Sequence, residues 1–122
     1  MDAAELQKRT KLFAIRVIKL CKTLEKDFVG RIIANQLLRS ATSIAANYRA
    51  VCRAKSLKDF IAKLAVVIEE SDESVFWIEL LIESNIIKSH LISNLLEEAN
   101  AITAIMVASR HSAIVHSKSK NQ

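Results

Sequence analysis

The sequence predicts an all-α fold, an antiparallel up-down-up-down four-helix bundle within a single domain of 122 residues. Proline is absent and Gly30 is the only glycine, so the chain has few residues that favour tight turns or β-hairpins. Hydrophobic residues make up 51% of the chain and charged residues 25%, which is typical of a globular domain with one core. Apolar residues recur at helical spacing between short breaks, and short connections make consecutive helices antiparallel.

The first two helices are predicted from their apolar positions. The first extends from about residue 3 to residue 26, and residues 27–30 form the first break, which contains the glycine. The second covers about residues 31–54. At about 100° per residue, one face of this helix is apolar and consists of Ile33, Leu37, Ala41, Ile44, Ala45, Tyr48, Val51 and Cys52.

The third and fourth helices are predicted from the residues at their ends as well. Ser56 followed by Asp59 is the acidic form of a capping box, so the third helix begins near residue 57. It ends near the turn marked by Ser84 and Asn85, and the fourth helix covers about residues 89–114. The bundle is expected to occupy residues 1–116, followed by a flexible basic tail at residues 117–122.

A second face of the helix at residues 31–54 is rich in arginine. Together with the following lysine, its basic residues are the candidate nucleic-acid-binding residues: Arg31, Arg39, Arg49, Arg53 and Lys55. Each could neutralise a phosphate and release counterions, an effect that does not depend on base sequence. The chain has none of the zinc-finger, aromatic-strand or helix-turn-helix patterns that read bases, so binding would be weakly specific. The arginines could also form a solvated face or salt bridges between subunits.

The third helix carries more apolar residues than one buried face needs. Opposite its core-facing stripe lie Ala62 and the four residues predicted to form an oligomer interface, which are Val66, Phe76, Trp77 and Leu80. In the alternative interpretation, Trp77 lies at a seam inside the bundle and Phe76 is a partly exposed aromatic residue.

Charge is distributed unevenly along the chain. Residues 1–55 have a net charge of +8, residues 56–85 of −5 and residues 86–122 of +2. The acidic third helix could attract neighbouring helices of the same subunit. It could also meet the basic helices of a second copy, and such a head-to-tail contact closes into a ring if its rotation permits.

The run QLLRSATSIAANY at residues 36–48 resembles the small bacterial four-helix-bundle family of the 23S rRNA intervening-sequence proteins, which is related to the accessory variability protein of diversity-generating retroelements. The family pattern Q-x-x-R-S/A-x-x-S-I-x-x-N is matched by Gln36, Arg39, Ser40, Ser43, Ile44 and Asn47, and S-x-x-D-F by Ser56, Asp59 and Phe60. Many members have an acidic residue and then glycine or alanine after the asparagine, whereas this chain has Ala50 and Val51.

The resemblance implies a ring-like homo-oligomer, often a pentamer, with a positively charged surface. It also implies a connection with nucleic acid, because the related accessory protein contacts RNA and assists a reverse transcriptase. We therefore predict a non-enzymatic, oligomeric bundle that binds RNA or DNA backbone, or a ribonucleoprotein partner such as a reverse transcriptase. The alternative is a purely protein-binding assembly module, in which the same arginines serve subunit contacts.

One pair of residues is a candidate for catalysis. Arg110 and His116 lie in an R-H-x-x-x-x-H run that resembles the R-x(4–6)-H signature of helical HEPN ribonucleases. That resemblance implies an arginine that holds the scissile phosphate and a histidine that transfers a proton. Six residues turn a helix by roughly 600°, which places the two side chains about 120° apart. A HEPN-like ribonuclease is therefore kept only as a remote alternative.

The remaining sequence features predict no cofactor, no metal site and no membrane contact. No uninterrupted apolar run approaches the roughly twenty residues of a membrane span, and the charged N-terminus does not resemble a signal peptide. We therefore expect a cytoplasmic protein. Cys21 and Cys52 lack metal-ligand spacing and are expected to be reduced, structural thiols.

Overall fold

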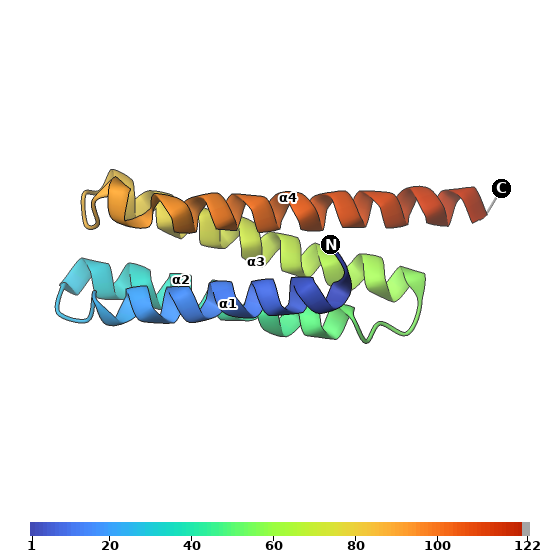
Figure 1. The fold of residues 1–122 in the computed structure, drawn as a ribbon, viewed down its shortest axis with the longest axis horizontal. Helices are drawn as coiled ribbons and strands as arrows, with labels where there is room; N and C mark the ends of the chain where they lie inside the picture. The colour runs from blue at the N-terminus through green and yellow to red at the C-terminus, as the bar shows by residue number, and fades with distance from the viewer. Residues whose placement is uncertain (121–122) are drawn as a thin grey trace.

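The computed structural model describes residues 1–120 and confirms the all-α prediction. These residues form four helices and no strand: α1 (Ala3–Lys22), α2 (Phe28–Val51), α3 (Leu57–Glu83) and α4 (Ser89–Lys120). The helices alternate in direction and are joined by short connections (Figure 1). The packing is that of a four-helix bundle.

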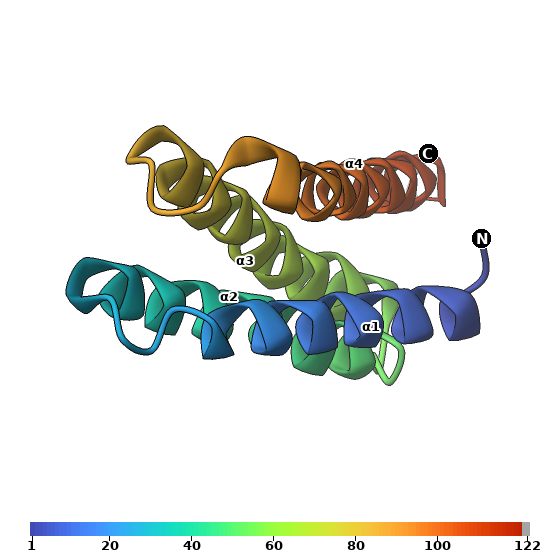
Figure 2. The ribbon, with the colours of Figure 1, turned by 60° about the vertical axis from the view of Figure 1, so that its left-hand side comes forward.

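α3 occupies the central position in this packing. It contacts α2 and α4 extensively and crosses obliquely between them (Figure 2). α1 packs mainly on α2 and has few contacts with α4, and no contact joins α1 to α3 within residues 1–120. α1 and α3 therefore lie diagonally across the bundle, and their outward faces point in opposite directions.

One charged contact bridges the sparse seam between α1 and α4. The Arg9 guanidinium donates two hydrogen bonds to the Glu98 carboxylate, from Nε at 2.8 Å and from Nη2 at 2.6 Å. A planar guanidinium fits a carboxylate in this two-point geometry. The pair thus links two helices that have few contacts with each other.

The position predicted for the first break is wrong. α1 ends at Lys22, and α2 already begins at Phe28 because the Asp27 side chain accepts a hydrogen bond from the Gly30 N–H at 2.6 Å and caps the helix. Gly30 therefore lies inside the first helical turn, where its N–H is one of the groups that only a cap can satisfy. A glycine in that position does not interrupt the helix.

Both ends of α3 have the predicted cap residues. Ser56 Oγ accepts from the Asp59 N–H at 3.0 Å, while the Asp59 carboxylate accepts from the Lys55 N–H at 3.0 Å, one residue before the usual capping-box partner. At the other end Asn85 has a left-handed backbone (φ 62°). The Ile86 N–H then donates to the Leu81 carbonyl at 3.1 Å, as in a Schellman motif.

The core confirms most of the apolar face predicted for α2. Its residues are buried except Ala45, which is half-buried, and Cys52, which is exposed. The placement of Cys52 in the core is corrected, because α2 ends at Val51 and Cys52 is the C-cap residue. Cys21 is half-buried, and its thiol donates to the Ala34 carbonyl at 3.4 Å.

Two hydroxyl pairs join the helices inside the core. Ser40 of α2 and Ser74 of α3 are fully buried, and their Oγ atoms are 2.8 Å apart. One turn away, Ser71 of α3 forms a hydrogen bond with Thr103 of α4. The hydroxyls of Ser40, Ser74 and Thr103 also lie within hydrogen-bond distance of a carbonyl of their own helix. No such contact is formed by the Ser71 hydroxyl. No buried side-chain polar atom among the described residues lacks a partner.

α4 is longer than predicted. It continues past residue 114 to Lys120 and includes part of the expected tail, of which Asn121 and Gln122 lie outside the described residues. By length and composition alone, α4 is long and apolar enough to cross a bilayer. Its apolar residues are interrupted by polar ones, so it contains no continuous apolar run of that length. In the fold, 28% of this apolar segment is buried, and Ile92, Ile102 and Met106 of α4 lie in the core.

Candidate nucleic-acid interface

The arginines predicted to form one stripe on α2 have three different environments. Arg31 lies in the first turn, with its guanidinium carbon 6.0 Å from the centre of the Phe28 ring. Arg39 forms ion pairs with Glu70 and Glu73 of α3. Only Arg49, in the last turn of α2, and Arg53, which lies just beyond α2 and not on the helix as predicted, face a groove. At 1.5 Å per residue, Arg31 and Arg49 are separated by about 27 Å along the axis of α2.

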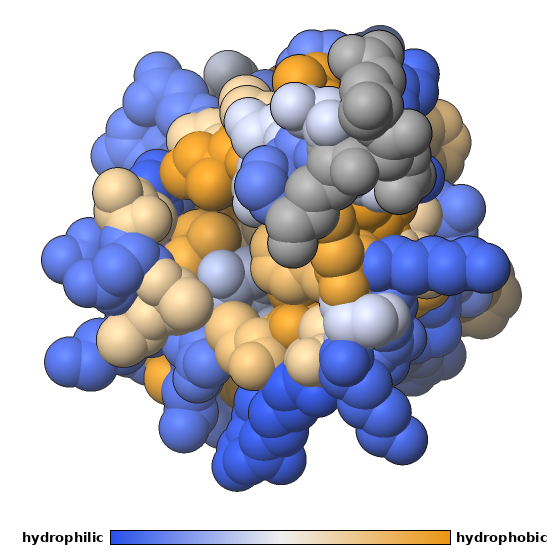
Figure 3. Space-filling model, turned by 90° about the vertical axis from the view of Figure 1, so that its right-hand side faces the viewer, coloured by the Kyte–Doolittle hydropathy of each residue, from blue (hydrophilic) through white to orange (hydrophobic). Residues whose placement is uncertain are grey.

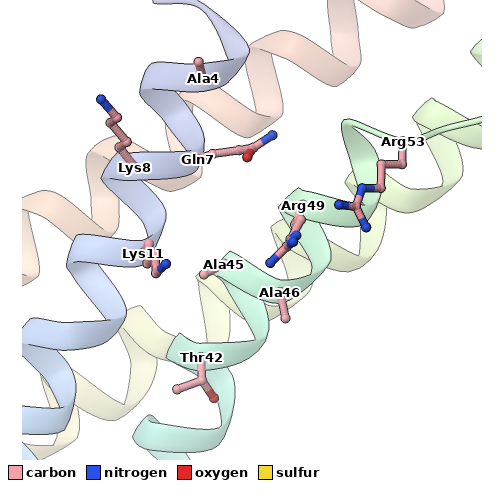
Figure 4. Close-up of a pocket in the computed structure, with 9 residues that line it drawn as sticks. All are labelled: Ala4, Gln7, Lys8, Lys11, Thr42, Ala45, Ala46, Arg49 and Arg53. Atoms are coloured by element: carbon pink, nitrogen blue, oxygen red, sulfur yellow. The ribbon is translucent and has the colours of Figure 1, made fainter.

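The groove lies between α1 and α2 and has a volume of about 620 Å³. Small residues of both helices form part of its lining, and Gln7, Arg49 and Arg53 point into the space between the helices, whereas Lys8 points away (Figure 4). The complete lining is Ala4, Gln7, Lys8, Lys11, Thr42, Ala45, Ala46, Arg49 and Arg53. It contains four basic residues and no acidic one.

None of the four basic residues in the groove forms an ion pair with another described residue of the chain. The nearby Lys55, also predicted as a binding residue, lies in the α2–α3 connection with its side chain exposed, while its backbone N–H is used by Asp59. Hydrogen bonds, first from Lys63 Nζ and then from this N–H, lower the pKa of the Asp59 carboxyl. The acid closest in sequence to Arg53 and Lys55 is thus occupied by its own partners.

Sequence reasoning missed the contribution of α1 to this groove. Gln7, Lys8 and Lys11 were not among the predicted binding residues, although their spacing places them on one side of a helix. Residues 7–22 also contain no aspartate or glutamate. A charge count by helix face, instead of by long segments, would have revealed the second basic row.

The groove opens toward the end of the bundle that holds the N-terminus and the α2–α3 connection. Viewed from that end, apolar surface lies near the centre and hydrophilic side chains surround it (Figure 3). Arg53 and Lys55 belong to this end by their position in the chain. A ligand in the groove would therefore meet basic groups on both helices and at the rim.

The four predicted interface residues also divide into two groups. Phe76 is 52% exposed and Val66 42%, whereas Trp77 and Leu80 are half-buried and pack against the core. The Phe76 and Trp77 rings are in edge contact, with centroids 4.9 Å apart. Of this set, Phe76 and Val66 are therefore available to a partner.

Trp77 is tied to the candidate binding residue Arg39 through Glu73. The Trp77 indole N–H donates to Glu73 Oε1 at 3.1 Å, and Arg39 pairs with the same oxygen. The hydrogen bond from Trp77, followed by that from Arg39, lowers the pKa of the Glu73 carboxyl. The side chain of Arg39 thus has a partner inside the subunit.

The residues of the HEPN-like pattern lie on α4. Arg110 Nε donates to the Ile61 carbonyl of α3 at 3.1 Å, and His116 is exposed. Both residues belong to one continuous helix, which keeps their side chains about 120° apart around its axis. Arg110 is therefore held against α3, away from the direction of His116.

Comparison with known proteins places the chain in a family. The model of the family described as 23S rRNA-intervening sequence protein matches residues 3–108. A crystal structure of a protein of unknown function from the S23 ribosomal protein family of Bacteroides thetaiotaomicron has 30% identity and a TM-score of 0.84, covering 91% of this chain and 99% of that one. No curated protein matches. The matched model spans most of the domain, so the chain belongs to the 23S rRNA-intervening sequence protein family.

Proposed function

We propose that this protein binds the sugar-phosphate backbone of a nucleic acid in the groove between α1 and α2. The observation that carries the proposal is the groove lining, which contains Lys8 and Lys11 of α1, Arg49 of α2 and Arg53 just after α2, and no acidic residue. Of these, Lys8 points away from the groove (Figure 4). Cations without partners in the subunit can release counterions from phosphates, which makes binding favourable and dependent on salt. The proposal assigns the chain binding and no reaction.

The composition of the groove favours backbone contacts over base recognition. Its lining has no aromatic side chain on which a base could stack, and Gln7 and Thr42 are the only lining residues with neutral polar side chains. Phosphate contacts position a nucleic acid without reading its sequence. RNA and DNA single strands of unrelated sequence should therefore bind with similar affinity. A ribonucleoprotein partner such as a reverse transcriptase would be bound through its nucleic acid.

A pair of variants with equal charge change tests the proposal. Arg49→Ala with Arg53→Ala removes two groove cations, and Lys26→Ala with Arg31→Ala removes two exposed cations at the opposite end of α2. Binding of a fluorescent, unstructured single-stranded RNA is measured by anisotropy at several salt concentrations. The groove variant should bind more weakly and lower the salt slope by about 0.7 for each lost phosphate contact, while the control keeps the wild-type slope. Equal losses in both variants, or no binding by the wild type, would refute a site in the groove.

We also infer that the protein assembles as a homo-oligomer, with five copies as the number that the family resemblance implies. The exposed Phe76 and Val66 support an interface on α3. They also support the second candidate function, a protein-binding assembly module without a nucleic-acid ligand. Light scattering after size-exclusion chromatography, together with the 260/280 absorbance ratio before and after a high-salt wash, separates the two. An oligomer whose ratio does not change, and which binds no added RNA, favours the assembly module.

A further inference from the structure

We propose that copies of this protein associate head to tail, with the outer face of α1 in one copy packed against the outer face of α3 in the next. The inference rests on the oligomer part of the proposed function and names the two surfaces that form the contact. It is carried by two helical stripes that are complementary in charge and spacing, that each have an apolar residue at the centre, and that cannot meet within one subunit.

The first stripe, called here the basic stripe, runs along the outside of α1. Its residues alternate in spacing by four and three positions, which is the spacing of a coiled-coil seam, and they are Lys8, Leu12, Ile15, Lys19 and Lys22. All five are exposed, Leu12 by 57% and Ile15 by 40%. Two large aliphatic side chains thus lie in water between lysines.

The second stripe, called here the acidic stripe, runs along the outside of α3. Its residues alternate by three and four positions and are Glu69, Asp72, Phe76, Glu79 and Glu83. All five are exposed, and the aromatic ring at the centre is 52% exposed. Residues 64–87 contain no lysine or arginine, so nothing on this part of α3 offsets its negative charge.

The two stripes match in length as well as in charge. Each spans fifteen residues, from Lys8 to Lys22 and from Glu69 to Glu83, or about 21 Å between its end residues at 1.5 Å per residue. Ile15 and Phe76 are the middle residues of the two stripes. Whether the helices pair in parallel or antiparallel, Ile15 and Phe76 meet at the centre and each of the three lysines faces an acidic residue. Leu12 faces the fourth acidic residue, beside the central apolar contact.

Neither stripe has a partner inside the subunit. None of the three lysines or four acids takes part in an ion pair with another described residue. α1 and α3 lie diagonally across the bundle without contact, so the stripes face opposite ways. Contact between unlike, oppositely directed surfaces leaves a free stripe at each end of a dimer. Further copies therefore add to the free stripes until a ring closes or a filament forms.

The contact and the proposed nucleic-acid groove use nearly separate residues. Lys8 is the only residue common to both, and its side chain points away from the groove (Figure 4). Lys11, Arg49 and Arg53 lie outside the basic stripe. Variants can therefore disrupt either property while leaving the other in place.

The test uses Ile15→Asp, which alters the centre of the basic stripe, and Phe76→Asp, which alters the centre of the acidic stripe. Each variant alone should sediment as a monomer at concentrations where the wild type is oligomeric. A mixture of the two has one intact pair of stripes, and the other possible contact brings two aspartates together. The mixture should therefore form a one-to-one dimer and nothing larger. Val107→Asp, at a site on α4 that is 49% exposed, is the matched control and should keep the wild-type mass.

Circular dichroism verifies that each variant is folded, and RNA anisotropy is recorded on all of them. Higher NaCl should also weaken wild-type assembly about tenfold, because three exposed ion pairs contribute to the contact. The proposal is overturned if the wild type is monomeric, if both variants keep the wild-type mass, or if the mixture remains monomeric. RNA binding by monomeric variants would preserve the groove proposal. An intact oligomer that does not bind RNA would preserve the head-to-tail proposal and contradict the groove proposal.

Discussion

The Arg39 guanidinium of α2 and the Glu73 carboxylate of α3 form an ion pair within the subunit, and the Trp77 indole donates to the same carboxylate oxygen at 3.1 Å. An arginine predicted to bind nucleic acid and a tryptophan predicted to bind another subunit thus share one acidic partner. Each substitution in this group alters the surroundings of the others. The three residues are best probed together.

The Arg39→Ala variant separates a structural from a ligand-binding role. Because two glutamates already neutralise much of the charge of this arginine, RNA affinity should change by less than about twofold, in contrast to Arg49→Ala. Trp77 emission should shift, since its acceptor Glu73 loses the ion pair. Anisotropy and tryptophan fluorescence measure the two effects. A loss of RNA affinity as large as that of Arg49→Ala would return Arg39 to the binding surface.

Glu73 should contribute to the loss of stability in acid. Its pKa in the folded protein is lowered by the Trp77 hydrogen bond and by Arg39. A carboxyl with a lowered folded pKa stabilises the fold above the pKa of the unfolded chain, and that contribution is lost as the pH falls through the folded pKa. Urea midpoints measured at decreasing pH should fall less steeply for Glu73→Gln than for the wild type. The matched control Glu97→Gln, at an exposed position on α4 outside both stripes, should retain the wild-type steepness.

The buried pair of Ser40 and Ser74 predicts a strongly non-additive pair of substitutions. Ser40→Ala should lower the free energy of unfolding by about 1 kcal/mol, because Ser74 loses one partner in the core. Adding Ser74→Ala should cost less than a second such loss, since no hydroxyl then remains in need of a partner. Urea unfolding of the two single variants and the double variant measures the coupling. Simple additivity would show that the hydroxyl contact has no energetic effect.

The two cysteines should differ in reactivity. Burial raises the pKa of the Cys21 thiol to about 11, and this thiol donates to a backbone carbonyl, whereas Cys52 is exposed. The thiolate is the reactive form, so a thiol reagent at neutral pH should label Cys52 quickly and Cys21 only after local opening or unfolding. Mass spectrometry over time, with Cys52→Ser as the control, measures both rates. Rapid labelling of the Cys52→Ser variant would contradict the burial of Cys21.

The sequence predicted the helices better than it predicted the residues that share a surface. Capping at Ser56 and the turn at Asn85 are local features, and both occur as expected. The break predicted at Gly30 was wrong because the Asp27 side chain caps α2 and accepts a hydrogen bond from the Gly30 N–H. Composition does not reveal this hydrogen bond. Arg39 and Arg49 lie on the same side of α2 in a helical projection. The packing of α3, which the sequence does not reveal, places Arg39 beside two glutamates and leaves Arg49 at an open groove.

The hydroxyl contacts of α3 restrict how its neighbours can move along it. Ser74 meets α2 and Ser71 meets α4, so the same short segment of α3 is bonded on both sides. Sliding α3 by one helical turn, about 5.4 Å, would separate both pairs at once and leave the Ser71 hydroxyl without a partner in the core, while the other three would keep only a carbonyl of their own helix. The apolar side chains around them could be repacked in other registers. The polar contacts therefore select a single alignment of α2, α3 and α4, and with it the placement of the acidic stripe that α3 presents to the outside.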